Sequence, residues 1–207
     1  MGEYKHLIFD VDGTLINNEF AVLSTWKEAL FEMLGKVWEM KDLTFVLGIP
    51  GETSFEKLGF INPKAAFERW GEIFQKYRPT IKLFDNISDT LAALKEKGMQ
   101  LGIITSRLPS EVASEALLQD VAKYFSTIVC STDSPRPKPF ADPILTYMKK
   151  NCCLQEEILY IGDTLYDAEC AQNASVDFGL AMWDKSSAKS IAAKYIFNSP
   201  KDILSIV

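Results

Sequence analysis

The sequence predicts an α/β fold: a three-layer α/β/α core around a mostly parallel sheet, interrupted by a small all-helical insertion. Two features support this prediction. Short apolar segments alternate with helical segments over most of the chain, and this alternation is typical of parallel strands joined by right-handed crossovers. Residues 17–79 instead carry apolar side chains at helical spacing, with no convincing strand among them.

The composition is that of an ordinary soluble globular protein, since 47% of the 207 residues are apolar and 24% are charged. The net charge of −6 argues against a general surface for nucleic acid or anionic membranes. No segment reaches the roughly 18 apolar residues of a membrane span, and no signal-peptide pattern is present. None of the four cysteines lies in a CxxC pair, which fits a reducing cytoplasm.

Six short segments are predicted to form the sheet. Most of them are apolar on both parities, as expected of strands that are buried on both faces. They are residues 5–9, 101–105, 127–130, 158–162, 178–182 and 195–197.

Helical segments separate most of these strands, and their ends carry suitable residue types. Ser88 is predicted to cap a helix over residues 89–97, and Ser110 one over residues 111–118. Ser199 followed by Pro200 marks the start of the last helical segment, because proline is favoured at the first helical position.

The insertion is predicted to be a helical domain of its own. Two apolar stripes are expected to meet in one aromatic-rich interface. The insertion is also far longer than a single crossover needs. The predicted division is therefore residues 1–16 and 80–207 for the core and 17–79 for the helical domain. The stripes are Phe20, Leu23, Leu30, Phe31 and Leu34, and Phe67, Trp70, Ile73, Phe74 and Tyr77.

The first predicted strand runs directly into Asp10-Val11-Asp12-Gly13-Thr14-Leu15. Alternate strand residues point to the same side, so Asp10 and Asp12 are expected to share one space. In an open α/β sheet, the carboxyl ends of the strands border the ligand crevice. Two carboxylates there indicate chemistry, although taken alone the segment also fits an ordinary polar turn.

Three further polar clusters each follow a later strand and are expected at the same edge of the sheet. Together with Asp10 and Asp12, they would gather four carboxylates, which one lysine cannot balance. A divalent cation can, and Mg²⁺ prefers oxygen ligands. The ion and Lys138 would also suit a phosphoryl group. The clusters are Thr105-Ser106-Arg107, Arg136-Pro137-Lys138-Pro139, and Asp163 and Asp167 in Gly162-Asp163-Thr164-Leu165-Tyr166-Asp167.

A carboxylate is the remaining plausible nucleophile, because the only histidine, His6, lies in the first strand and no cysteine lies in a motif. Aspartyl-phosphates are known covalent intermediates. A second carboxylic acid could protonate the leaving alkoxide and later activate water. Asp10 and Asp12 have the spacing for these two roles, but the chemistry alone does not assign them.

These motifs resemble those of the haloacid-dehalogenase-like hydrolases, specifically the phosphoglycolate-phosphatase-like branch with a helical cap. The resemblance covers nearly the whole chain. Residues 10–15 and 162–167 are similar to the first and fourth motifs of the family, and both are specific. Residues 105–107 and 138–139 look like the second and third motifs, and residues 17–79 look like the cap. The resemblance implies a Rossmann-like core.

The resemblance also implies roles for the matching residues. Asp10 would be the nucleophile and Asp12 the general acid and base. Mg²⁺ would be held by Asp10, the backbone carbonyl of Asp12, and Asp163, with Asp167 as a nearby carboxylate of the metal site. The residues that would bind the phosphate are Thr105, with Ser106 beside it, and Lys138.

The predicted function is therefore a Mg²⁺-dependent phosphatase that hydrolyses a small phosphomonoester through an aspartyl-phosphate. Candidate substrates are phosphoglycolate, sugar phosphates, nucleotides and pyrophosphate. Two alternatives remain open: a phosphomutase of the β-phosphoglucomutase type, and a non-enzymatic signalling module that is phosphorylated on aspartate. We expect a monomer or homodimer that binds a small phosphorylated metabolite, and neither nucleic acid nor membrane.

Overall fold

The computed structural model describes residues 4–183 and 191–207, which belong to two compact units. One unit runs to Ile16 and resumes at Leu83, and the other is Asn17–Lys82. Residues 80–82, predicted as core, therefore group with the helical unit. Two short strands, β2 (Ile16–Asn17) and β3 (Lys82–Leu83), pair where the chain passes from one unit to the other.

The larger unit is built on a six-stranded sheet with the order β5-β4-β1-β6-β7-β8. Each pairing between neighbouring strands is parallel, and β1 lies between β4 and β6. The predicted α/β fold is confirmed, and every predicted strand lies within two residues of its expected bounds. The strands are β1 (His6–Phe9), β4 (Gln100–Ile104), β5 (Phe125–Val129), β6 (Ile158–Gly162), β7 (Asp177–Ala181) and β8 (Tyr195–Phe197).

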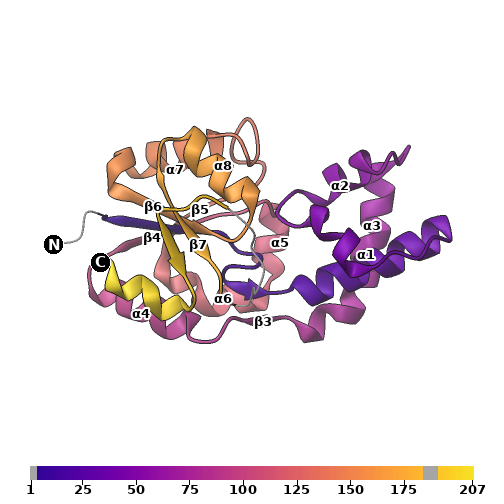
Figure 1. The fold of residues 1–207 in the computed structure, drawn as a ribbon, viewed down its shortest axis with the longest axis horizontal. Coiled ribbons are helices and arrows are strands. Elements are labelled where there is room, and N and C mark those ends of the chain that lie inside the picture. Colours follow the sequence, from indigo (N-terminus) through magenta and orange to yellow (C-terminus); the bar gives the residue numbers. More distant parts are fainter. Residues whose placement is uncertain (1–3, 184–190) are drawn as a thin grey trace. The chain divides into compact units, whose positions relative to one another are not determined.

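Helices cover both faces of this sheet (Figure 1). On one face, α7 (Asp142–Asn151) and α8 (Leu165–Asn173) contribute Tyr147 and Cys170 to a buried cluster with Ile8 of the central strand. On the other face lie α4 (Ile87–Glu96) and α6 (Ala116–Val121). None of the described helices is long and apolar enough to span a bilayer.

Two predicted helix starts were wrong. The helix α4 begins behind Asn86, whose φ is 67°, and not behind Ser88. The segment predicted over 111–118 forms two short helices, α5 (Pro109–Ser114) and α6. Asparagine tolerates the left-handed region and proline presets the first helical φ, so residues upstream of each serine set the start. Ser199 accepts a hydrogen bond from the Lys201 N–H before the 3₁₀ segment Pro200–Ser205, as predicted.

The helical unit contains α1 (Glu19–Leu34), α2 (Gly51–Lys57) and α3 (Pro63–Tyr77). Its core is aromatic: the ring centroids of Trp26 and Phe55 lie 4.2 Å apart, and Trp70 stacks on Phe74 at 4.7 Å. The predicted aromatic interface is therefore present within this unit.

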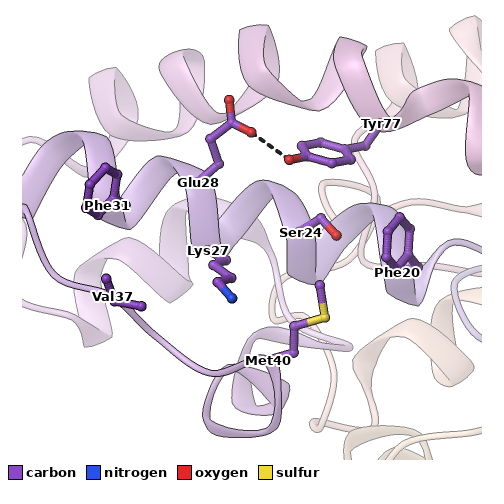
Figure 2. A pocket seen from close by; sticks show the side chains of 8 residues that line it. All are labelled: Phe20, Ser24, Lys27, Glu28, Phe31, Val37, Met40 and Tyr77. Carbon is purple, nitrogen blue, oxygen red and sulfur yellow. Dashed lines mark hydrogen bonds between the residues drawn. The ribbon is translucent and has the colours of Figure 1, made fainter.

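The face of α1 that enters this core agrees with the predicted stripe only in part. Leu23, Trp26 and Leu30 are buried, whereas Phe20 and Phe31 are each 56% exposed. The latter two line a groove of about 430 Å³ within the helical unit (Figure 2). The helix carries apolar side chains on two faces, and the face that includes the large Trp26 side chain is the one that packs against α2 and α3. The groove is lined by Phe20, Ser24, Lys27, Glu28, Phe31, Val37, Met40 and Tyr77.

The only histidine, His6, lies in the central strand of the sheet, and its pKa reports on its burial. His6 is buried on β1, and its Nδ1 atom lies 3.2 Å from the Tyr147 hydroxyl. Burial lowers the pKa of its imidazole below the ordinary value of 6.5. The unfolded chain then binds a proton first as the pH falls, so the contribution of His6 to stability is present above pH 6.5 and lost as the pH drops through the folded pKa.

We therefore expect the ring C–H signals of His6 to titrate in NMR spectra of the folded protein with a midpoint below 6.5. A midpoint at or above that value would contradict the burial of the imidazole.

Candidate active site

Three acidic side chains meet at the carboxyl edge of the central strands. Asp10 follows β1, Asp163 follows β6, and Asp167 lies in the first turn of α8. A carboxylate oxygen from each lies within 4.8 Å of the other two. The exposed fractions of these residues are 2, 4 and 0%, so this carboxylate cluster is almost completely withdrawn from water.

One ammonium group enters the carboxylate cluster. The Lys138 Nζ donates to Asp10 Oδ1 at 2.8 Å and to Asp167 Oδ1 at 2.6 Å, and the residue is only 4% exposed. Three carboxylates against one ammonium leave an excess of negative charge. Like charges at such short range in a buried site repel strongly, and a cation held by these carboxylate oxygens would offset that repulsion.

The ionisation of the cluster is unequal. Burial raises the pKa of Asp10 well above its usual value, against the influence of Lys138, and Asp167 and Asp163 raise it further. Burial also acts to raise the pKa of Asp167, but Lys138 and the other hydrogen-bond donors outweigh it and lower that pKa. Asp10 is therefore less stable as an anion than Asp167, mainly because its burial is not offset to the same extent by hydrogen-bond donors.

The hydrogen bonds of Asp167 occupy its acceptor positions. Oδ1 accepts from Lys138 and, at 2.7 Å, from the Tyr160 hydroxyl. Oδ2 accepts from the backbone N–H of Thr164 at 3.0 Å and from its hydroxyl at 2.6 Å. A carboxylate has about four lone-pair positions. Asp167 therefore orients Lys138, and Asp10 and Asp163 are the carboxylates of the cluster better placed to hold Mg²⁺.

The turn after β1 packs closely against Asp163. The Thr14 hydroxyl donates to Asp163 Oδ1 at 3.0 Å. Gly13 has a φ of 83°, and a Cβ atom there would lie 2.3 Å from Asp163 Oδ2. Only glycine fits both the backbone conformation and this approach, so Gly13 allows the first and fourth motifs to meet.

Asp12 does not join the carboxylate cluster. Its carboxylate pairs with Arg107, whose Nη2 donates to Asp12 Oδ1 at 2.6 Å. The strand β1 ends at Phe9, and the N–H groups of Leu15 and Ile16 fold back to the Val11 carbonyl. The alternation of a strand therefore stops before Asp12, which lies outside the group of three carboxylates. Its charge still acts to raise the pKa of Asp10, and that the two carboxylates share one space stays a prediction.

The second motif follows β4, which neighbours β1 in the sheet. The Thr105 N–H donates to the Val129 carbonyl at 3.0 Å, and the Thr105 hydroxyl accepts from the Arg107 N–H at 3.2 Å. Thr105 is buried and Ser106 is partly exposed. Both follow a strand parallel to β1, so the structure places them at the same edge of the sheet as the carboxylate cluster.

Sequence reasoning missed two features of this site. The first is the Tyr160 hydroxyl, which reaches Asp167 from inside the sheet. A tyrosine in the otherwise aliphatic segment 158–161 was the available signal, because a buried hydroxyl needs a partner. The second is the pairing of Arg107 with Asp12 and Glu115, for which the sequence carries no local signal.

A family model supplies the decisive comparison. The model described as haloacid dehalogenase-like hydrolase matches residues 7–181, which include all four motifs. The chain belongs to this family. Its predicted membership and its predicted class as a hydrolase are confirmed.

Relatives of known name cover nearly the full length of the chain. Pyrophosphatase PpaX of Bacillus velezensis is 25% identical over 97% of this chain and 94% of its own. Pyrophosphatase PpaX of Oceanobacillus iheyensis is 26% identical over 98% of this chain and 96% of its own. The crystal structure of a Lactobacillus plantarum protein, named provisionally as a phosphoglycolate phosphatase, matches with a TM-score of 0.83 at 27% identity and covers 99% of both chains.

Proposed function

We propose that this protein is a Mg²⁺-dependent phosphatase that cleaves a small phosphorylated metabolite through an aspartyl-phosphate on Asp10. The observation that carries the proposal is the carboxylate cluster with Lys138 inside it. Its excess negative charge suits a divalent cation, and the cation together with one ammonium suits a phosphoryl group. The family membership and the names of the relatives support the same class of reaction.

The proposed reaction has two steps, and both use residues at this edge of the sheet. An Asp10 carboxylate oxygen attacks phosphorus, the bond from phosphorus to the leaving oxygen breaks, and that oxygen takes a proton from Asp12. Water then gives a proton to Asp12 and attacks the phosphorus, the bond to Asp10 breaks, and inorganic phosphate leaves. Asp12 is thereby returned to its protonated form.

The other residues hold the groups that react. A Mg²⁺ ion held by Asp10 and Asp163 would supply positive charge to the phosphoryl oxygens. Lys138 is kept charged, because Asp10 and Asp167 raise its pKa against the effect of burial. It is therefore suited to bind a phosphoryl oxygen as a point charge, with the Thr105 hydroxyl as a further donor.

A phosphate-release screen tests the proposal. The purified protein is assayed with Mg²⁺ on pyrophosphate, phosphoglycolate, sugar phosphates and nucleoside monophosphates. We expect inorganic phosphate from at least one of them, with pyrophosphate and phosphoglycolate the first to examine because relatives carry those names. Interconversion of sugar phosphates without phosphate release would favour a phosphomutase.

Removal of the metal is the second part of this test. Exhaustive treatment with EDTA should abolish phosphate release, because the carboxylate cluster would keep its uncompensated charge. Excess Mg²⁺ should restore it. Full activity after chelation would contradict the metal role and leave the nucleophile assignment standing.

A further inference from the structure

Arg107 donates hydrogen bonds to the carboxylate of Asp12 from two of its guanidinium nitrogens. Nε donates to Asp12 Oδ1 at 3.1 Å and to Oδ2 at 2.9 Å, and Nη2 donates to Oδ1 at 2.6 Å. The arginine side chain is 13% exposed and that of Asp12 is 30% exposed. Fork-like pairing of this kind fixes the plane of a carboxylate as well as its distance.

Glu115 holds the opposite side of the guanidinium. Its Oε2 lies 3.4 Å from Arg107 Nη1, and its side chain is 8% exposed. The other oxygen, Oε1, accepts from the Leu117 N–H at the start of α6. Glu115, which is itself held at the start of α6, therefore contacts the Nη1 side of the guanidinium group. Asp12 contacts the side formed by Nε and Nη2.

The backbone of Arg107 is held as well. Its N–H donates to the Thr105 hydroxyl at 3.2 Å, and its carbonyl accepts from the Ser131 N–H at 3.0 Å. Burial acts to lower the pKa of the guanidinium, but Asp12 and Glu115 outweigh it, so Arg107 stays charged. The arginine therefore has contacts that hold its backbone and both ends of its guanidinium group.

We propose that Arg107, anchored by Glu115, is a positioning residue that holds the Asp12 carboxyl group in the orientation needed for proton transfer. The inference rests on the proposed role of Asp12 in the phosphatase reaction. Proton transfer by a positioned side chain contributes about 10²–10⁴-fold to a rate, and a small misplacement forfeits much of it. A variant that misplaces Asp12 should therefore lose most activity on substrates whose leaving group must be protonated as it departs.

Arg107→Gln is the main test, on two substrates. One is p-nitrophenyl phosphate, whose leaving group departs without a proton, and the other is the alkyl phosphate that the wild type hydrolyses fastest. For the alkyl phosphate we expect kcat to fall by about 10–100-fold with little change in KM. For p-nitrophenyl phosphate we expect a fast first turnover and then slow release, because only the hydrolysis of the phosphoenzyme still needs Asp12.

Further variants separate positioning from a purely structural effect. Arg107→Lys keeps the charge without the fork and should recover part of kcat. Glu115→Gln should also show a fast first turnover on p-nitrophenyl phosphate followed by slow release, with a smaller loss of kcat than Arg107→Gln. If Arg107→Gln does not fold, Glu115→Gln serves as the test. Arg69→Gln removes a comparable fork, on Glu32, from a side chain that is 45% exposed, and should leave the kinetics unchanged.

The outcomes distinguish a failure of the positioning role of Arg107 from a failure of the proposed function. If Asp12→Asn shows the burst and Arg107→Gln does not, the positioning role is wrong and the proposed function stands. If Asp12→Asn shows no dependence on the leaving group, the acid and base assignment itself fails. A higher kcat in Arg107→Gln, or a raised KM with unchanged kcat, would also overturn the inference, since Arg107 would then restrain Asp12 or bind substrate.

Discussion

Asp10→Asn should abolish phosphate release while leaving the protein folded. The carboxamide keeps the shape of the side chain and can still accept the hydrogen bond from Lys138, which is 2.8 Å long in the native protein. An amide is not a useful nucleophile toward phosphorus, so the covalent route is closed. We expect a loss on the order of 10⁴-fold or more in kcat, as is typical when a member of a nucleophilic set is removed.

The stability of this variant should separate chemistry from folding. Burial and the neighbouring carboxylates raise the pKa of Asp10, so its charged form is not a source of stability. Replacing it with a neutral isostere also leaves the contact between Lys138 and Asp167 in place. Urea unfolding should therefore show a free energy of unfolding within about 1 kcal/mol of the wild type, or above it.

Asp177→Asn is the matched control, because Asp177 is a carboxylate at the opposite end of the sheet strands. It starts β7 and accepts hydrogen bonds from Tyr4 and Lys194. Its variant should keep wild-type turnover. Normal turnover by Asp10→Asn, measured on the same substrate, would refute the nucleophile assignment.

Most of the core fold could be predicted because it depends on patterns that are local in the sequence. The segment 158–162 is apolar throughout, and it forms β6 with the predicted bounds. Phe20 and Phe31 were wrongly predicted to be buried with Leu23 and Leu30, because α1 is apolar on two faces and periodicity alone does not rank these faces. Packing against Phe55 and Trp70, which are distant in sequence, decides which face is buried.

The sequence could predict only those parts of the candidate site whose position follows from where the parallel strands end. Asp10 and Asp163 meet because β1 and β6 are parallel and adjacent, and the alternation of elements implied a parallel sheet. Lys138 reaches Asp10 from the connection after β5, which is separated from β1 by β4. The direction of Asp12 depends on how the chain turns after Asp10, and on an arginine that follows another strand. Such pairings arise from three-dimensional contacts between side chains, and no spacing in the sequence encodes them.

Lys138→Met should destabilise the protein far more than the loss of an ordinary ion pair. It removes the ammonium that Asp10 and Asp167 share in a site where all three residues are buried. Breaking a buried pair from one side leaves uncompensated charge and costs about 3–5 kcal/mol. We expect a decrease of that size in the free energy of unfolding, measured by urea titration in EDTA, together with the loss of phosphate release.

Two comparisons show whether uncompensated charge is the cause. Adding Asp167→Asn to Lys138→Met removes one of the two stranded carboxylates, so the double variant should regain part of the lost stability. Lys76→Met breaks the pair with Glu28, whose lysine side chain is 63% exposed, and should cost less than about 1 kcal/mol. Equal losses in Lys138→Met and Lys76→Met would mean that the carboxylate cluster does not depend on Lys138, and Asp167 would then lose its proposed role of orienting that lysine.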